Sequence, residues 1–260
     1  MPANTPNLAI PYPLAADPAN VPSDMLALAT RIDNLAGSGV FSKAPTRQAF
    51  FSGSGTYTTP AGCRAILVEC MGGGGGGGGC NVGSAGQVAG GGGGGGGGYS
   101  SALIANPVAS YAYQVGQGCA GGAAGNNPGA TPAAANDTTF GASLVVAKAG
   151  SPGLGMASST TSATCAGGAG GVGVSGTGDV RLDGGDGGAA LIPAPSIGVA
   201  GYGGAGAMYG QSRAGSVSLA ANGATGYRGS GGTGGIRTSA SATQSGGAGG
   251  WGIIVVTEFY

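Results

Sequence analysis

Two uninterrupted runs of glycine, Gly72–Gly79 and Gly90–Gly98, constrain most strongly what this chain can fold into. Each glycine costs about 1 kcal/mol relative to alanine inside an α-helix, so neither run can form an ordinary helix. A flexible linker is the simplest alternative, but both runs are embedded between segments with the composition of β-strands. We therefore favour polyglycine II helices, which have about three residues per turn and no internal hydrogen bonds. Their peptide groups must then bond to neighbouring helices.

Polyglycine II packing also accounts for the glycine-rich segments farther along the chain. Other small residues interrupt these segments, which span 166–178, 198–207, 226–235 and 245–252. At the rim of a bundle, only the inward faces need glycine, so side chains can occupy the outward positions. We expect the pure runs at the centre of the bundle and the interrupted runs at its periphery. Collagen is excluded because the strict Gly-X-Y period is absent.

Segments rich in β-branched and aromatic residues flank the glycine runs. The predicted strands are 49–59, 64–71, 99–105, 111–115, 140–149 and 251–260, with a turn at 59–62. The last segment, WGIIVVTEFY, would be an aggregation hazard if exposed, and we expect it to pair with 64–71. The predicted fold class is mainly β and irregular. A small β-sandwich or sheet frames a bundle of polyglycine II helices, with a short N-terminal α-helix of the coiled-coil type.

The sequence divides into four parts of different composition. Prolines punctuate residues 1–22, which predicts an extended strap that attaches to a partner. Residues 23–36 predict a helix, residues 37–47 a linker, and residues 48–260 the glycine-rich domain.

The predicted helix carries an apolar seam formed by Met25, Leu28, Ile32 and Leu35. A helix of about two heptads is too short to be stable alone in water, so something must cover this seam. The helix can pack on the chain's own domain, or it can self-associate or dock on a carrier protein. We favour the second alternative, with a homotrimer as the expected assembly, because the rest of the chain offers few large apolar residues for docking.

The composition excludes several classes of function. The chain has no histidine, which removes a Ser-His-Asp triad and histidine metal ligands. Nine basic residues balance nine acidic ones and are scattered, so a nucleic-acid groove is not expected. No apolar run reaches the ~18 residues of a membrane span, so membrane insertion is not expected. We predict no enzymatic activity, no catalytic residues and no cofactor.

The cysteines and the acidic residues give no metal site. The five cysteines contain no CxxC spacing. They are either small apolar fillers or form one or two disulfides among Cys80, Cys119 and Cys165. The acidic cluster in GDVRLDGGDGG could hold a carboxylate pair or a calcium turn. It occurs once, however, whereas repeat-type calcium sites are tandem, and we predict no metal.

The stretch GTYTTPAGCRAILVECMGGGGGGGG and the closing GGAGGWGIIVVTEFY resemble the glycine-rich domain of bacteriophage tail fibres and adhesins. The chain is also similar to the distal adhesins of T-even-like phages, whose polyglycine II helices carry variable loops at the tip. The resemblance covers residues 48–260. It implies binding to a host surface through the tip loops, without catalysis. The N-terminal strap and helix differ from those adhesins and look like the virion-attachment end of a short trimeric fibre.

The order of strands and glycine runs predicts which residues form the tip. If the strands lie at one end of the domain, the segments 80–89, 126–138 and 236–245 lie at the far end. The candidate receptor-binding residues are Asn81, Gln87, Asn126, Asn127, Arg237, Thr238 and Gln244. Their side chains suit hydrogen bonding to sugars or to outer-membrane protein loops. Exposed tyrosines also favour recognition, and Tyr202, Tyr209 and Tyr227 could act in this way or cap the edge of the bundle.

We expect a virion protein made in the host cytoplasm that joins a phage tail or baseplate protein through residues 1–36. Its expected target is a bacterial surface polysaccharide or an outer-membrane protein. Two alternatives remain open at this point. The chain could be a purely structural fibre or cap of the virion without receptor binding. It could also be an ice-binding or surface-coating protein, since flat Ala/Thr faces occur on such glycine bundles.

Overall fold

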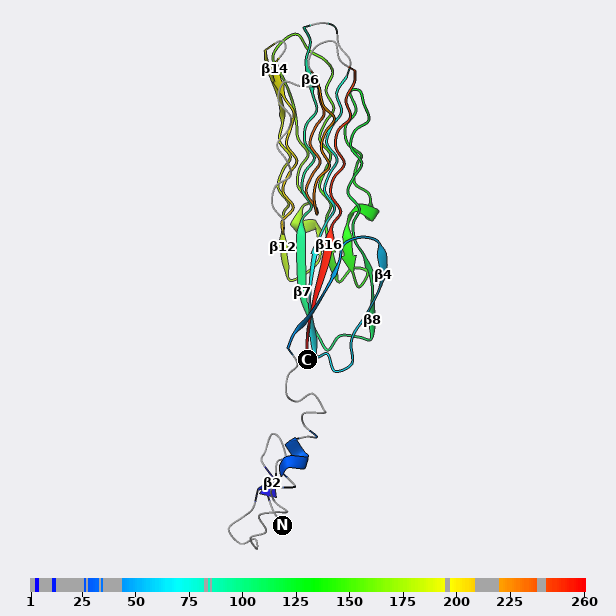
Figure 1. The fold of residues 1–260 in the computed structure, drawn as a ribbon, viewed down its shortest axis with the longest axis vertical. Helices are drawn as coiled ribbons and strands as arrows, with labels where there is room; N and C mark the ends of the chain where they lie inside the picture. The colour runs from blue at the N-terminus through cyan, green and yellow to red at the C-terminus, as the bar shows by residue number, and fades with distance from the viewer. Residues whose placement is uncertain are drawn as a thin grey trace.

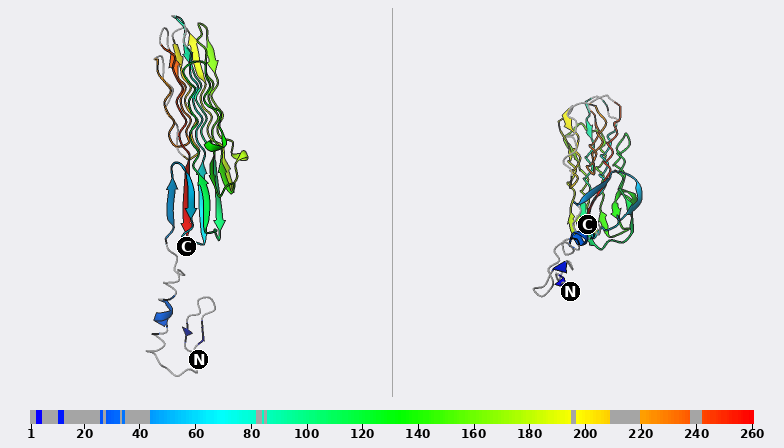
Figure 2. Two further views of the ribbon diagram at one scale, coloured as in Figure 1. Left: turned by 90° about the vertical axis from the view of Figure 1, so that its right-hand side faces the viewer. Right: turned by 60° about the horizontal axis from the view of Figure 1, so that its bottom comes forward.

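The structure is a computed structural model, drawn as a ribbon in Figure 1. It describes residues 3–4, 11–12, 26, 28–32, 34, 44–81, 84, 86–194, 197–208, 220–237 and 242–260. From residue 44 onward the described chain forms an elongated body, with a β-sandwich at one end and a bundle of extended segments reaching the other (Figures 1 and 2). The fold is mainly β, with several antiparallel sheets and one short helix, as predicted.

Two small elements precede this body. Strands β1 (Ala3–Asn4) and β2 (Pro11–Tyr12) form an antiparallel pair. The short helix includes residues 26, 28–32 and 34. Two residues of the predicted apolar seam, Leu28 and Ile32, are 37% and 42% exposed. The other two, Met25 and Leu35, lie outside the described residues, and self-association through this seam stays a prediction.

The β-sandwich consists of two antiparallel sheets. One sheet has the strand order β12 (Val180–Leu182), β7 (Tyr99–Ala105), β5 (Ala65–Met71), β16 (Ile253–Phe259), β3 (Thr46–Phe50). The other has the order β10 (Val145–Ala147), β9 (Thr138–Phe140), β8 (Ser110–Gln114), β4 (Ser54–Thr58). Buried side chains from both sheets form the core between them: Tyr57, Ile66, Val68, Cys70, Tyr111, Val115, Phe140, Val145, Ala147, Ile254 and Val256.

The C-terminal strand β16 lies inside its sheet, between β5 and β3. It pairs antiparallel with β5 over its whole length, so the predicted pairing is confirmed. Ile254 and Val256 point into the core of the sandwich, whereas Ile253 and Val255 pack with Met71 on the opposite face of the sheet. Burial on both faces explains why the sequence IIVV is continuously apolar rather than alternating.

The predicted strand 49–59 is divided into β3 and β4, which belong to different sheets. The chain bends after β3, where Gly53 adopts a left-handed conformation with φ of 79°. The turn that follows β4 lies one residue later than predicted. The Cys63 N–H donates to the Pro60 carbonyl at 3.2 Å, and Gly62, with φ of 81°, occupies the position that requires glycine.

The predicted strand 140–149 is also divided and forms the hairpin β9–β10. Residues 141–144 connect the two strands, and Gly141 and Ala142 both have φ of 59°. Because alanine rarely adopts this conformation, the sequence FGASLVV predicted one continuous strand. The structure has a turn there instead.

The first glycine run forms an extended helix whose hydrogen bonds repeat every third residue. Its bonds to the second run join Gly72 N to Gly98 O, Gly75 N to Gly95 O and Gly78 N to Gly92 O, at 2.8–2.9 Å. In the same repeat, its other peptide groups bond to the segments 119–125, 150–156, 232–235 and 247–250. A period of three with all bonds directed sideways is the polyglycine II arrangement.

The second run lies equally deep in the bundle. Its peptide groups bond to six segments: 72–78, 148–154, 168–171, 185–188, 201–207 and 229–235. A Cβ atom added at any position of Gly72–Gly79 or Gly91–Gly97 would lie 1.8–2.2 Å from a backbone oxygen of a neighbouring segment. The pure runs are therefore central, as predicted, because no side chain fits there.

Segments at the rim keep glycine only on their inward faces. In the run 166–172, Ala166, Ala169 and Val172 are exposed at every third position. The intervening Gly168 and Gly171 are buried. The segment 166–178 is therefore peripheral, as its composition predicted.

The interrupted segment 226–235 differs from the expectation, because its residues 229–235 are all buried, Ser230 and Thr233 included. Its amides bond to 201–204 on one side and to Gly75 and Gly78 on the other, so neighbouring segments surround it.

Small sheets close the end of the bundle that is remote from the sandwich, where Figure 1 labels β6 and β14. Strand β6 (Ala89–Gly90) pairs with β15 (Ile236–Arg237), and β13 (Ala190–Ala194) lies between β11 (Ala163–Cys165) and β14 (Ile197–Val199). A second core supports these sheets and consists of Val88, Met156, Cys165, Ala190 and Ile192. Two short 3₁₀ helices, η1 (Ala134–Asn136) and η2 (Gly173–Ser175), lie elsewhere in the chain.

Candidate functional site

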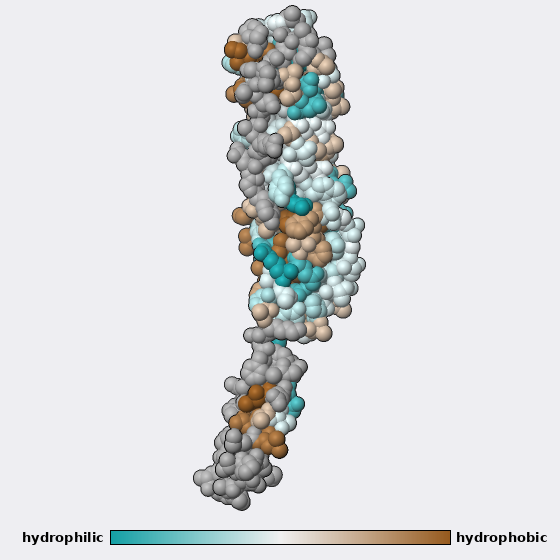
Figure 3. All heavy atoms as spheres, viewed as in Figure 1, coloured by the Kyte–Doolittle hydropathy of each residue, from teal (hydrophilic) through white to brown (hydrophobic). Residues whose placement is uncertain are grey.

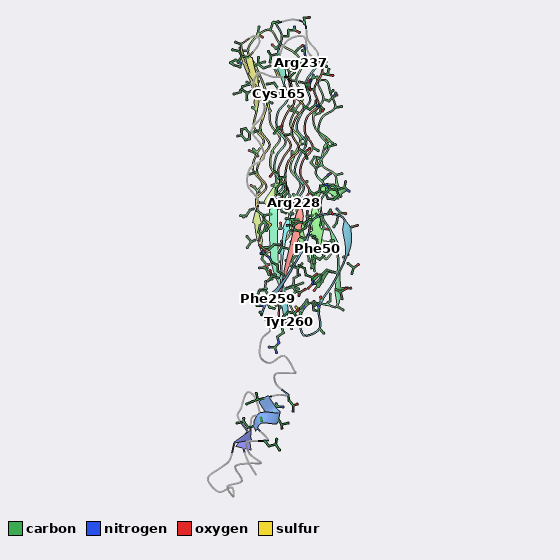
Figure 4. The ribbon with its side chains drawn as sticks, in the orientation of Figure 1. Phe50, Cys165, Arg228, Arg237, Phe259 and Tyr260 are labelled. Carbon is green, nitrogen blue, oxygen red and sulfur yellow. The ribbon has the colours of Figure 1, made fainter. Side chains whose placement is uncertain are left out.

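The candidate site is the end of the bundle opposite the sandwich, which we call the distal tip. We define it as the described residues of 80–90, 123–127, 156–165, 190–200 and 236–245. The first glycine run leaves β5 and the second enters β7, so the connection between them lies at this end. The C-terminal part joins it there, because the Cys80 N–H donates to the Gln244 carbonyl at 2.9 Å. Figure 4 labels two residues of the tip, Cys165 and Arg237.

The segment 126–138 reaches the tip only at its start, which corrects the expectation of one long distal loop. The Gly79 N–H donates to the Asn127 carbonyl at 2.8 Å, which places this turn at the end of the first glycine run. The Ala130 N–H then donates to the Ala120 carbonyl at 2.9 Å, so the chain is already returning. By Thr138 it has entered β9 of the sandwich.

Three of the predicted receptor-binding residues, Asn81, Gln87 and Asn127, use side-chain or backbone groups to shape the tip turns. Asn81 is exposed, and its N–H donates to the Met156 carbonyl at 3.1 Å. Gln87 is half-buried, and its Oε1 accepts the Ser84 N–H at 2.8 Å. Asn126 and Asn127 are exposed neighbours at the turn of the returning segment.

The amide side chains of Asn127 and Gln244 also bind nearby backbone. Asn127 Nδ2 lies 3.4 Å from the Ala123 carbonyl and 3.3 Å from the Ala124 carbonyl. Gln244 Nε2 donates to the Ala242 carbonyl at 3.1 Å. Each amide keeps further donor or acceptor capacity for a ligand. Thr238, another of the predicted residues, lies outside the described residues.

Arg237 differs from the expectation of an exposed tip residue, because its side chain is completely buried. Its backbone belongs to β15, where it pairs with Ala89 of β6. Its guanidinium Nη1 lies 3.3 Å from the Asn81 carbonyl. A buried guanidinium that binds the Asn81 carbonyl supports the tip from within, so Arg237 is a positioning residue of the tip rather than an exposed contact residue.

The structure exposes an apolar surface at the tip that the sequence analysis did not single out. Leu191, Ile197 and Val199 are 50%, 52% and 37% exposed on β13 and β14. Leu191 lies opposite Val199, and Ile197 opposite Ala194, in the register of these strands. A pocket of ≈ 390 Å³ adjoins them, lined by Ser162, Ala163, Thr164, Leu191, Ile192 and Pro193. Brown spheres mark apolar residues at this end in Figure 3. The sequence feature that could have predicted this surface is the alternation of large apolar residues with smaller ones in ALIPAPSIGV.

A family model for the glycine-rich domain matches residues 49–257. The chain belongs to this glycine-rich domain family. The match begins within β3 and ends within β16, so it spans the bundle and nearly all of the sandwich. A comparison with curated proteins gave no match.

The cysteines of the glycine-rich domain are all described, and all five thiols are free. They act as small apolar side chains, so the disulfides considered among Cys80, Cys119 and Cys165 are absent. Burial raises the pKa of the Cys80 and Cys119 thiols to about 11. Burial also raises the pKa of Cys70 in the sandwich core.

The acidic cluster of the glycine-rich domain completes the rim of the bundle. Asp183 Oδ1 accepts the Gly173 N–H at 2.6 Å, and Asp186 Oδ1 accepts the Gly170 N–H at 2.8 Å. Both residues are exposed, and their carboxylates take the place of a neighbouring helix. Among the described residues, no three acidic or cysteine side chains gather as a metal site. In the same part of the chain, no helix has the length and apolarity needed to cross a membrane.

Proposed function

We propose that this chain is a receptor-binding fibre protein of a bacteriophage tail, which binds the host surface through the distal tip. The observation that carries the proposal is the placement of the two ends of the matched domain. Both β3 and β16, with which the glycine-rich domain begins and ends, lie in the sandwich, and the tip lies at the opposite end of the bundle. A domain attached through its N-terminal side therefore presents the tip outward.

The bundle suits this task because it is stiff along its length. Its segments are connected sideways by backbone hydrogen bonds in a three-residue repeat, and its interior leaves no space for a methyl group. Dense packing of this kind resists bending, so it holds the tip at a fixed distance from the sandwich. The tip can then vary in sequence without changing the support beneath it.

The tip offers the two kinds of contact that a surface ligand needs. Exposed amides at Asn81, Asn126 and Asn127 can bond to sugar hydroxyls or to peptide groups. The apolar surface at Leu191, Ile197 and Val199 can bury against a partner. We propose a bacterial surface polysaccharide or an outer-membrane protein as the target, and a binding role without catalysis.

The N-terminal part has a separate role in this proposal. Residues 1–36 attach the chain to a phage tail or baseplate protein, and the helix brings three copies together. The protein is then made in the host cytoplasm and functions in the virion.

Binding of the labelled full-length protein to a panel of bacterial strains tests the proposal. The tip variant Leu191→Ser with Val199→Ser removes the exposed apolar side chains and keeps their strands. The matched control, Ala169→Ser, changes an exposed residue on the side of the bundle. We expect one or more strains to bind the wild type and the control, and the tip variant to bind at least about tenfold more weakly. Equal binding of the tip variant, or no binding by the wild type, would contradict receptor binding and favour a purely structural fibre.

A further inference from the structure

A second group of recognition-type side chains lies far from the tip, where the bundle meets the sandwich. It consists of Phe51, Tyr227, Arg228 and Trp251, which we call the junction patch. The three aromatic residues are 45%, 68% and 38% exposed. Figure 4 labels Arg228 at this level, and Figure 3 shows brown apolar surface where the bundle meets the sandwich.

Three separate parts of the chain bring these residues together. Tyr227 and Arg228 begin a tight turn that the Ser230 N–H closes on the Tyr227 carbonyl at 2.7 Å. The Gly229 N–H of that turn donates to the Trp251 carbonyl at 2.6 Å. Trp251 lies two residues before the first residue of β16, and Phe51 directly follows β3. These two strands pair with each other, with Phe50 opposite Ile254.

The guanidinium of Arg228 holds the centre of the patch. Its Cζ lies 4.4 Å from the centroid of the Phe51 ring and 5.7 Å from that of Tyr227. One nitrogen, Nη1, donates to the Phe51 carbonyl at 3.0 Å. A guanidinium has five N–H donors in a planar fork, so most of them are still available for a ligand. Among the residues that the structure describes, no carboxylate forms an ion pair with Arg228.

We propose that the junction patch binds a carboxylated sugar, such as a uronic acid unit of a polysaccharide. Arginine forks bind planar carboxylates with two parallel hydrogen bonds. The exposed aromatic faces can pack against the apolar C–H face of a pyranose ring. All three aromatic residues are exposed, so the patch is open to solvent and can take one unit of a long chain that passes across the surface. This site is distinct from the distal tip and would act on polysaccharide that surrounds the shaft of the fibre.

Trp251 makes this proposal directly measurable, since it is the single tryptophan of the sequence. The full-length protein is titrated with oligomers of polygalacturonate, alginate and hyaluronan, and the fluorescence of Trp251 is followed. Neutral dextran and dextran sulfate serve as controls for sugar without charge and for charge without carboxylate. We expect saturable quenching or a spectral shift with at least one carboxylated oligomer, and neither with the two controls.

The decisive variant is Arg228→Asn, because asparagine tolerates the positive φ of 21° at this position. Arg64→Asn, an exposed arginine elsewhere in the sandwich, is the matched control. Loss of a charge-assisted bidentate contact predicts at least about tenfold weaker binding for Arg228→Asn and no change for Arg64→Asn. Arg228→Lys, which keeps the charge without the fork, is expected to weaken binding as well.

Several results would overturn the proposal: no signal with any of the three oligomers, an equal response to dextran sulfate, or unchanged binding by Arg228→Asn. Retained circular dichroism of that variant shows that a loss of binding is not a loss of the fold. The tip variant Leu191→Ser with Val199→Ser is expected to bind the oligomers normally. The junction patch and the receptor-binding proposal can therefore fail independently of each other.

Discussion

At the scale of single residues, the interior of the bundle excludes even a methyl group. At Gly94, for example, an added Cβ would lie 2.2 Å from the Gly75 carbonyl oxygen. The contacting atom is backbone, which cannot rotate away as a side chain would. Gly75 is also held to the second run by a hydrogen bond, since its N–H donates to the Gly95 carbonyl at 2.8 Å. One methyl group must therefore displace a whole segment.

We predict that Gly94→Ala lowers the free energy of unfolding by about 3 kcal/mol or more, because the two central runs must separate. The control Ala169→Ser changes an outward position of a rim segment and is expected to change it by less than about 0.5 kcal/mol. Urea unfolding of both variants measures the difference. Equal stability of Gly94→Ala and wild type would mean that the run is not packed.

The thiols give a second prediction at this scale. In the native protein, Cys70, Cys80, Cys119 and Cys165 are buried and Cys63 is half-buried. Since burial raises the pKa of Cys80 and Cys119 to about 11, little thiolate forms at these positions between pH 7 and 9. We expect an aromatic disulfide reagent to modify at most one thiol rapidly over this pH range. All five are expected to react after denaturation in urea. Rapid reaction of three or more native thiols would contradict this packing.

At the scale of elements, a single carboxylate connects the first strand of the sandwich to the last. Glu258 of β16 is 2% exposed and accepts bonds from two residues of β3 and one of β4. Its Oε2 binds the Thr46 hydroxyl and the Tyr260 hydroxyl, the latter at 3.0 Å. Its Oε1 accepts from Gln48 Nε2 at 2.7 Å and from the Tyr57 hydroxyl at 2.8 Å.

Burial opposes the charge of Glu258, but these four hydrogen bonds outweigh it and lower the pKa of the carboxyl. A lowered pKa in the folded state contributes stability that is present above the unfolded pKa and is lost as the pH falls through the folded pKa. We predict that Glu258→Gln costs about 2 kcal/mol at pH 7. The difference from wild type should shrink as the pH is lowered from 7 toward 3, because the stability supplied by the ionised carboxyl is lost as the pH falls through its lowered folded-state pKa. Urea unfolding at the two pH values measures it, and an equal loss at both would contradict this account.

Much of the architecture follows from sequence pattern alone. Segments 64–71, 99–105, 111–115 and 251–260 form strands because β-branched and aromatic residues favour a half-buried pleated surface. The pure glycine runs occupy the centre because the space between neighbouring segments there is too small for a methyl group. The breaks inside 49–59 and 140–149 fall at small residues, Ser52-Gly53 and Gly141-Ala142. They were missed because glycine and serine also occur inside strands of this chain, and because each break depends on which sheet the two halves join.

The site was less predictable than the fold. The order of strands and glycine runs located the distal connections, but the orientation of individual side chains depends on packing between segments far apart in sequence. Arg237 is buried because β15 pairs with β6, a contact of residues about 150 positions apart, as in Ile236 with Gly90. The junction patch likewise depends on Phe51 and Trp251 meeting at the ends of paired strands.

At the scale of the whole molecule, the proposed assembly through the N-terminal helix would set how many tips one particle presents. Leu28 and Ile32 are partly exposed on the short helix and have the spacing of a self-association seam. We predict that the full chain has the mass of a trimer in solution and that a chain beginning at residue 40 has the mass of a monomer. Light scattering coupled to size-exclusion chromatography makes this measurement. A monomer in both cases would remove the helix as the assembly element.

The measurement that tests the central claim most directly is hydrogen exchange of the backbone amides in uniformly ¹⁵N-labelled protein, in which the glycine runs and the core strands are followed together. If the two pure runs form the hydrogen-bonded centre of the bundle, Gly72–Gly79 and Gly91–Gly98 must exchange as slowly as the core strands β5 and β16. We expect protection that lasts for hours at neutral pH. Exchange within seconds, as in a flexible glycine linker, would contradict the bundle and with it the rigid support of the distal tip.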